Sequence, residues 1–253
     1  MVWIRKRFIV YAVLIAAALV LSGIGSEFSL SGLLDQSNTI DFIRENFASL
    51  QWNLMPYLLE QSLITLSVAF LGTFAALLIA LPVSLLAAEN TSRSRAGFYG
   101  IRSFLSLVRS IPEIVFGLVF VASLGLGPFA ALLAIFFHNV SVLGKLIAEL
   151  VESSDKGPQE AMMSVGAGRR AGQIFSILPQ IWPNVLSHYF YRFEVAIRTS
   201  LVLGMIGGGG LGQSLINYYN SFAYESMATA IVLIMVMVII VDVTGGIVRK
   251  RVI

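Results

Sequence analysis

Long uncharged stretches alternate along this chain with short clusters of charged residues. Residues 8–25 contain no charge and directly follow three basic residues, and residues 61–88 are also uncharged throughout. A bilayer core of about 30 Å takes roughly 20 helical residues, so each stretch is predicted to cross a membrane once. The first lacks a clear small-x-small cleavage site, so we expect a retained span rather than a removed signal peptide.

Residues 114–144 carry no Lys, Arg, Asp or Glu. As one helix they would extend about 46 Å, which is too long for one crossing and too short for two. The Gly125-Leu-Gly-Pro128 sequence breaks the stretch, because Gly and Pro together stop a helix. A third span is therefore predicted to begin near Phe104, and a fourth to cover residues 129–149. The third then contains three residues that are unusual inside a bilayer: Arg109, Pro112 and Glu113.

Two further apolar stretches complete the pattern. Residues 184–206 form a predicted fifth span, and residues 226–248 form a sixth that ends in a basic cluster. The chain is thus predicted to be an all-α, polytopic membrane protein with about six transmembrane helices. We divide it into an N-terminal helix with an extracytoplasmic segment, residues 1–56, and a core of five helices, residues 57–253.

The charges of the loops predict which side of the membrane each loop faces. Residues 26–56 hold one basic residue against four acids, and residues 207–224 hold no basic residue. The N-terminus, residues 93–102, residues 155–180 and the C-terminus carry the basic residues instead. The positive-inside rule therefore predicts that both termini and the 155–180 loop are cytoplasmic.

The extracytoplasmic segment has one helical pattern. Ile40, Ile43, Phe47 and Leu50 recur at helical spacing with polar residues between them. This pattern predicts a short helix lying on the outer membrane surface, with a plain tethering connection as the alternative.

Composition narrows the function classes. The chain is 57% hydrophobic and 12% charged with a mean hydropathy of +0.84, whereas soluble domains are roughly 25% charged. The net charge of +3 gives no reason to expect nucleic acid, because the basic residues lie at span ends. The absence of cysteine excludes disulfides, thiolate metal sites and a cysteine nucleophile.

No catalytic, cofactor or metal site is predicted. The chain lacks the G-x-x-x-x-G-K-[ST] phosphate loop, so any ATP hydrolysis is expected in another subunit. The G-x-G-x-x-G run from Gly207 follows a membrane helix rather than a strand, so a dinucleotide site is not expected. Gly207 and Gly209 are expected to allow a sharp bend at the external end of the fifth span. His138 and His188 are too far apart in sequence to indicate a metal site.

The 155–180 loop is polar, basic and punctuated by glycine. A turn at Lys156-Gly157-Pro158 precedes a helix-favouring run with Glu160 in its first turn, where an acid suits the helix dipole. Gly166 and Gly168 are predicted to divide the loop into two short helices, and Leu178-Pro179 to redirect the chain into the next span. Such a pair of helices can fit a groove on a partner, and an amphipathic linker without a partner is the alternative.

Several ionisable residues are predicted at membrane depth, where they usually face the protein interior or a water-filled cavity. Arg109 and Glu113 are four residues apart, so the two side chains can meet on one helix face, and so can Glu194 and Arg198. Both pairs either join helices or line a translocation pathway. Pro112 is expected to open a kink that shapes a gate or cavity. Asp242 is expected to pair with a nearby basic residue.

The 155–180 loop reads E-A-x₄-G-x₁₁-L-P and resembles the conserved cytoplasmic loop of binding-protein-dependent importer permeases. The matching residues are Glu160, Ala161, Gly166, Leu178 and Pro179. Flanking segments over about residues 60–249 resemble one branch, the phosphonate permeases of ATP-binding-cassette (ABC) importers. These segments are Arg109–Glu113, Gly125–Phe129, Leu143–Leu146, Gly157–Ala161, Tyr191–Glu194 and Gly207–Gln213.

This resemblance implies a permease in the bacterial plasma (inner) membrane, with no enzyme activity of its own. It implies a second permease copy or a paralogue, a cytoplasmic ABC ATPase dimer gripping the loop, and an extracytoplasmic substrate-binding protein. The implied substrate is a phosphonate or a related small phosphorus oxyanion, which Arg109, Arg192 or Arg198 would attract.

Three alternatives stay open at this point. An ion-coupled secondary transporter would use Glu113 or Glu194 to carry protons, and an ABC importer permease for another small solute would share the same loop. An integral membrane enzyme acting on phosphorylated lipids would need clustered Asp or His residues, and the acids here are scattered.

Overall fold

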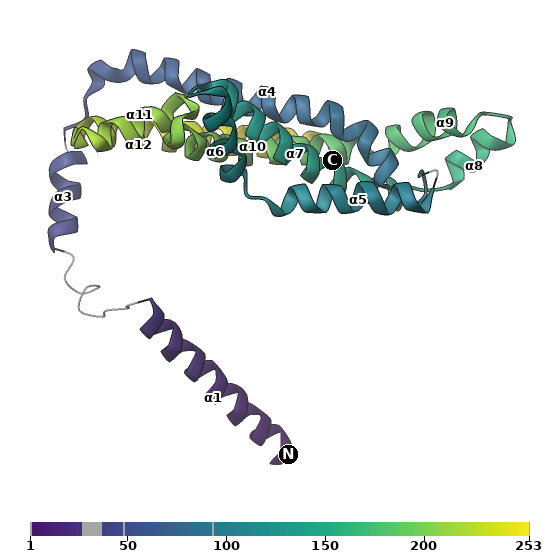
Figure 1. Ribbon diagram of the computed structural model, residues 1–253, viewed down its shortest axis with the longest axis horizontal. Helices are drawn as coiled ribbons and strands as arrows, with labels where there is room; N and C mark the ends of the chain where they lie inside the picture. Colours follow the sequence, from purple (N-terminus) through teal and green to yellow (C-terminus); the bar gives the residue numbers. More distant parts are fainter. Residues whose placement is uncertain (1, 27–36, 48, 93, 253) are drawn as a thin grey trace. The chain divides into compact units, whose positions relative to one another are not determined.

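The computed structural model describes residues 2–26, 37–47, 49–92 and 94–252, and every regular element within these ranges is helical (Figure 1). The predicted all-α class is confirmed. Residues 27–36 and 48 of the predicted extracytoplasmic segment, and the basic residue Arg93, lie outside the described ranges. The chain divides into two compact units, Met1–Ser49 and Leu50–Ile253.

The first unit contains two described helices, α1 (Val2–Gly25) and α3 (Ser37–Phe47). Helix α1 includes the predicted first span, and its stretch Arg7–Gly25 is long and apolar enough to cross a membrane. Helix α3 confirms that the segment predicted to be extracytoplasmic contains a short helix, and it includes Ile40, Ile43 and Phe47. It ends at Phe47, so the prediction that Leu50 belongs to the same helix is wrong.

The second unit begins with the 3-10 turn η1 (Trp52–Leu54). Its helices are α4 (Met55–Ala87), α5 (Arg95–Ser110), α6 (Glu113–Leu124), α7 (Pro128–Ser153), α8 (Gly157–Ser164), α9 (Arg169–Gly172), α10 (Leu178–Leu203), α11 (Gly210–Asn220) and α12 (Tyr224–Val252). Two π-helical segments flank α10, namely η2 (Gln173–Ile177) and η3 (Gly204–Gly208). Helices α4, α7 and α8 each carry proline in their first two positions, where a missing N–H costs nothing and the fixed φ suits a helix.

Four described helices are individually long and apolar enough to cross a membrane. They contain Arg7–Gly25, Trp52–Ala87, Pro128–Ser153 and Tyr224–Arg251. Two bent helix pairs pass the same criteria together, one bent by 82° between α5 and α6 and one by 54° before α11. The number of candidate spans reaches the predicted six when each bent pair is taken as one span.

The third span does not follow the straight course that the sequence suggested. Helix α5 ends at Ser110 and α6 starts at Glu113, so Arg109 and Glu113 lie on different helices. Ile111, between them, is extended with φ −85° and ψ 121°. A residue before proline is driven out of the helical region by the proline ring, so Pro112 accounts for the break.

The fifth span is longer than predicted and leads into an additional helix. Helical structure continues from α9 through η2, α10 and η3, so Leu178-Pro179 lies inside a helical run, and the prediction that it redirects the chain is wrong. The chain turns earlier, around Gly166. Residues 207–224, predicted as an external loop, contain the 11-residue helix α11.

The core of the second unit is built on close contact between α4 and α7, the most extensive helix pair in it. Small residues permit this approach: a Cβ added to Gly72 of α4 would lie 3.0 Å from Ile135 Cγ2 and 3.1 Å from the Leu132 carbonyl oxygen, both on α7. Small side chains at such contacts are typical of membrane helices, whose backbones pack closely. Helix α10 contacts α4, α7 and α12, so it occupies the centre of the unit.

Candidate functional site

The 155–180 loop lies at one end of the second unit. Figure 1 shows α8 and α9 beyond the ends of α4 and α5, whereas α11 lies at the opposite end of the unit. Gln180 joins the two ends of the loop: its Oε1 accepts from the Asp155 N–H at 3.1 Å, and its Nε2 donates to the Asp155 carbonyl at 3.3 Å. The loop therefore projects from a closed base.

Helix α8 is the first half of the loop. Glu160 is in its first turn, as predicted, and none of its residues is buried. The helix ends at Ser164, and Gly166, two residues later, has φ +84°; the Gly166 and Ala167 N–H groups donate to the Met163 and Met162 carbonyls at 3.0 Å each. This is the geometry in which a left-handed glycine closes a helix. The predicted division of the loop at Gly166 is present, but only α8 is a separate short helix, because α9 continues through η2 into α10.

The five residues predicted to bind an ATPase fall into two places. Glu160, Ala161 and Gly166 are exposed on the projecting part. Leu178 is half-buried at the base, where it packs against a core cluster that includes Ile147 and Ile181, and Pro179 is exposed beside it. The structure therefore gives Glu160, Ala161 and Gly166 the accessible surface, and Leu178 a role in anchoring the loop to the core.

Sequence reasoning missed the apolar surface of this loop. Val165 is 81% exposed and Phe175 70% exposed, and Met163 and Ile174 are also exposed. Met163 and Val165, large apolar residues beside Gly166 in an otherwise polar loop, could have indicated this surface from the sequence. An exposed apolar group with a polar surround is typical of a protein–protein contact.

The structure corrects both predicted ion pairs. Glu113 Oε1 lies 3.1 Å from His138 Nε2 and 3.7 Å from Arg192 Nη2, and among the described residues it has no ion pair with Arg109. Glu194 pairs with Arg249 of α12 instead of Arg198. Arg198 pairs with Asp242 of α12 at 2.5 Å, which confirms the expectation that Asp242 has a basic partner. The helix break at Pro112 separates the two residues of the first predicted pair. Helix α12 packs against α10 and supplies a different partner to each residue of the second pair.

A polar network within the helix bundle was not predicted. Arg192 donates through Nε and Nη2 to Asn139 Oδ1 at 2.9 and 2.5 Å, and Asn139 Nδ2 donates to Thr73 Oγ1 at 3.0 Å. With Glu113 and His138, this network joins α4, α6, α7 and α10. Buried polar groups are retained only where they are hydrogen-bonded or paired, and in a membrane span they mark functional positions.

One cavity brings together three of the residues predicted to line a pathway. Pro112, Glu113 and Arg198 line a cavity of about 330 Å³ between α6 and α10, together with apolar residues that include Val195 and Val202. Glu194 is not part of the lining, because its carboxylate is buried against α12. Arg109 is exposed at the end of α5.

Gly207 and Gly209 lie at the second helix break. Gly207 has φ +107° and Gly209 φ +75°, conformations that favour glycine. The Gly207 carbonyl accepts from the Gly127 N–H at 2.8 Å, so this break packs against the glycine-proline break between α6 and α7. The predicted sharp bend is present, at 54°.

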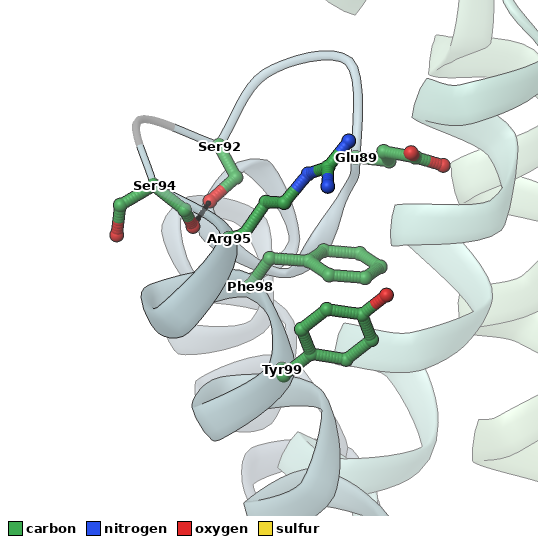
Figure 2. A pocket seen from close by; sticks show the side chains of 6 residues that line it. All are labelled: Glu89, Ser92, Ser94, Arg95, Phe98 and Tyr99. Carbon is green, nitrogen blue, oxygen red and sulfur yellow. Dashed lines mark hydrogen bonds between the residues drawn. The ribbon is translucent and has the colours of Figure 1, made fainter.

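A second hollow lies near the base of the 155–180 loop and has no counterpart in the sequence predictions. Figure 2 shows its lining side chains where the loop after α4 meets the first turns of α5. It measures about 370 Å³ and is lined by Glu89, Ser92, Ser94, Arg95, Phe98 and Tyr99. Its loop is fastened to η2, because Gln173 Nε2 donates to the Thr91 carbonyl at 3.3 Å.

Within the described residues, no group of three or more His, Cys, Asp or Glu side chains is placed to hold a metal ion.

The chain is similar in sequence to permease proteins of known transport systems. Over 187 residues the chain is 35% identical to the phosphite transport system permease protein PtxC of Stutzerimonas stutzeri, covering 74% of this chain and 68% of PtxC. It is 34% identical to the phosphate-import permease protein PhnE of Mycolicibacterium smegmatis, covering 74% of this chain and 35% of PhnE. The chain spans 63% of a further phosphite-system permease of S. stutzeri, so it matches less than two thirds of some curated relatives.

A solved structure of the MetNI methionine ABC transporter, in inward-facing conformations, contains a chain of the same fold. The TM-score is 0.71 at 21% identity, covering 81% of this chain and all of that chain. Residues 80–253, which hold the 155–180 loop, the cavity and both helix breaks, match the family described as binding-protein-dependent transport system inner membrane component. This protein, with its several membrane-length helices, belongs to that family of inner-membrane transport components.

Proposed function

We propose that this chain is the transmembrane permease subunit of an ATP-driven importer and forms the pathway for a phosphonate or a related small phosphorus oxyanion. The observation that carries the proposal is the projecting 155–180 loop, with Glu160 and Gly166 exposed and apolar side chains beside them. A surface of this kind at the end of a membrane bundle suits a soluble partner that supplies the energy.

The partners follow from the family and from the chain's own content. A binding-protein-dependent system uses an extracytoplasmic substrate-binding protein, and we expect a separate ATPase dimer to supply the energy for transport. A second permease copy or a paralogue would complete the pathway around α6 and α10. The distribution of basic residues supports a cytoplasmic location for both termini and for the loop.

The substrate class rests on the relatives and on the cavity. The relatives are named for phosphite and phosphate, and the cavity between α6 and α10 carries Arg198, with Arg192 held close by. A guanidinium group presents several N–H donors that match the oxygens of a phosphorus oxyanion.

The helical run from α9 to η3 supports a mechanical link between loop and cavity. It begins in the 155–180 loop, carries Arg192 and Arg198, and ends at the glycine-rich break. A displacement of the loop by the ATPase would therefore be transmitted along this rod to the cavity. The π-helical segments at its two ends are the positions where such a rod accommodates a change.

Uptake by the reconstituted complex tests this proposal. The permease, the ATPase and the binding protein are placed in proteoliposomes, and uptake of labelled phosphate is measured in competition with phosphite, methylphosphonate and methionine. We expect uptake to require ATP and the ATPase, and the phosphorus oxyanions to compete while methionine does not. Uptake without the ATPase that collapses with the proton gradient would instead establish an ion-coupled transporter. Competition by methionine alone would establish a permease for another solute.

A further inference from the structure

We infer that Glu113 is an internal substitute for the transported anion: it neutralises Arg192 in the empty pathway and is displaced when a phosphorus oxyanion binds there. This inference rests on the proposed function and names the residue pair that recognises the anion. It follows from the unequal way in which the two members of the pair are held.

The cation is fixed. The Arg192 side chain is only 11% exposed, and its Nε and Nη2 groups both donate to Asn139 Oδ1 on α7. Asn139 is itself buried and held by the Thr73 hydroxyl on α4. Because Arg192 belongs to α10, three helices determine where its guanidinium group lies. A preorganised guanidinium loses little freedom when it binds an anion.

The anion is held loosely by Arg192, and its closer contact is with His138, whose Nε2 lies 3.1 Å from Glu113 Oε1. Glu113 Oε1 lies 3.7 Å from Arg192 Nη2, which is an ionic contact but too long for a hydrogen bond. Its side chain is 27% exposed. The pair between Glu194 and Arg249, which also involves α10, differs: Glu194 is 9% exposed, within hydrogen-bonding contact, and tightly packed against Gly245. One helix thus carries a tight pair that joins it to α12 and a loose pair that borders the cavity.

The cavity gives the Glu113 side chain space into which it can move. It is the first residue of α6, directly after the break at Pro112, and it lines the 330 Å³ cavity with Arg198. A change of side-chain rotamer, or a small change of the 82° bend, would withdraw its carboxylate from both Arg192 and His138 into this space. The carboxylate then remains beside the site, where it can return.

The charges favour binding of a phosphorus oxyanion. Arg198 and Arg249 have carboxylate partners on the facing helix, Asp242 and Glu194 respectively. Arg109 has no ion pair among the described residues, yet its charge acts on both Arg192 and His138. With Glu113 still beside the site, Arg109 and Arg192 leave one positive charge that a phosphorus oxyanion offsets, and its three oxygens match the guanidinium donors.

The exchange also explains how the pathway can bind the anion and still release it quickly. Tight binding within a pathway slows release, so a weak and displaceable site is favoured. When the anion leaves, Glu113 returns to Arg192 and the site is again neutralised. Glu113 therefore sets the affinity of the permease for the anion, and its removal should raise that affinity while slowing turnover.

A fluorescence reporter in the cavity tests this. The chain has no cysteine, so Thr199→Cys, in the cavity lining, places a single fluorophore there. The full permease–ATPase complex in nanodiscs is titrated with phosphate, phosphite and methylphosphonate. We expect Glu113→Gln to bind the anion about tenfold more tightly than the reporter protein alone, which corresponds to about 1.4 kcal/mol. Its maximal uptake rate in proteoliposomes should fall, giving a lower KM with a lower kcat.

The matched control is Glu152→Gln. Glu152 pairs with Arg102, and its side chain is 27% exposed, as that of Glu113 is, but it lies outside the cavity lining. Its anion affinity should equal that of the reporter protein. Arg192→Gln should abolish the anion response. If Glu113→Gln does not assemble, Glu113→Asp, which shortens the side chain by one methylene, should give an intermediate gain.

The outcomes separate the two proposals. If the wild-type complex takes up phosphorus oxyanions with ATP but neither Glu113 variant binds them more tightly, Glu113 does not substitute for the anion and the proposed function stands. If the wild-type complex takes up no phosphorus oxyanion, the proposed function itself fails. A response retained in Arg192→Gln would also overturn the inference.

Discussion

At the scale of single residues, Gly166 and Gly168 show how one backbone angle shapes the 155–180 loop. Gly166 has φ +84° and closes α8 through the bonds that the Gly166 and Ala167 N–H groups make to α8 carbonyls. Gly168, two residues later, has no positive φ, and nothing lies within 4 Å of a Cβ added there. A Cβ at Gly166 also meets no neighbouring atom, so the two positions differ in conformation and not in space.

This difference predicts the effect of alanine at each position. A left-handed conformation costs an L-residue about 1–2 kcal/mol, which corresponds to a factor of roughly 5–30 in the population of the folded loop. Gly166→Ala is therefore expected to weaken ATPase binding by a factor of this order and to lower ATP-dependent uptake. ATPase titration onto the permease in nanodiscs measures the change. Gly168→Ala is the control and should bind normally. Equal effects at both positions would show that the conformation of Gly166 is unimportant.

At the scale of elements, the two glycine-rich breaks depend on each other. The break before α11 contacts the break before α7 through the hydrogen bond from the Gly127 N–H to the Gly207 carbonyl. A Cβ added to Gly207 would overlap Leu126 Cδ2 within the same contact. The two breaks therefore meet through backbone, and a side chain at Gly207 would require the exposed Leu126 side chain to move.

Gly207→Ala is expected to destabilise the permease. Backbone strain at a positive φ costs about 1–3 kcal/mol, and the exposed Leu126 side chain must also move to make room for the added Cβ. The apparent Tm of the purified protein in detergent should fall clearly below that of the wild type. Gly100→Ala is the matched control, since Gly100 lies within α5 with nothing within 4 Å of an added Cβ. A Tm unchanged by Gly207→Ala would show that the break adapts freely.

At the scale of the whole molecule, function depends on which membrane face each end of the bundle meets. The 155–180 loop and the turn between α11 and α12 lie at opposite ends of the second unit (Figure 1). The basic residues cluster toward the loop end, and residues 207–224 contain none. The positive-inside rule then predicts that the loop is cytoplasmic and that the α11 end faces outside.

Single cysteines test this orientation in a chain that contains none. In intact cells with a permeable outer membrane, a membrane-impermeant maleimide should label Ser221→Cys, in the turn after α11. It should label Glu160→Cys only after the inner membrane is opened. Both side chains are exposed, so accessibility within the protein does not bias the comparison. Labelling of Glu160→Cys in intact cells would reverse the proposed orientation and remove the site proposed for the ATPase.

Much of the fold follows from local chemistry that the sequence displays. Uncharged stretches of bilayer length indicate the spans, proline marks the first turns of α4, α7 and α8, and Gly125–Pro128 marks a break. These features depend only on neighbouring residues, because a helix forms its hydrogen bonds within itself. Helix α8 of the 155–180 loop could also be predicted, because the turn before it, the acidic residue in its first turn and the glycine that closes it all act locally.

The partners of the charged residues were decided only by tertiary structure. Spacing in the sequence favoured Arg109 with Glu113 and Glu194 with Arg198, but a pair four residues apart meets only if the helix is continuous and no better partner faces it. Pro112 breaks the first helix, and α12 supplies Arg249 and Asp242 to α10. The network of Arg192, Asn139 and Thr73 likewise requires three helices in one rotation and register, which long-range packing alone determines.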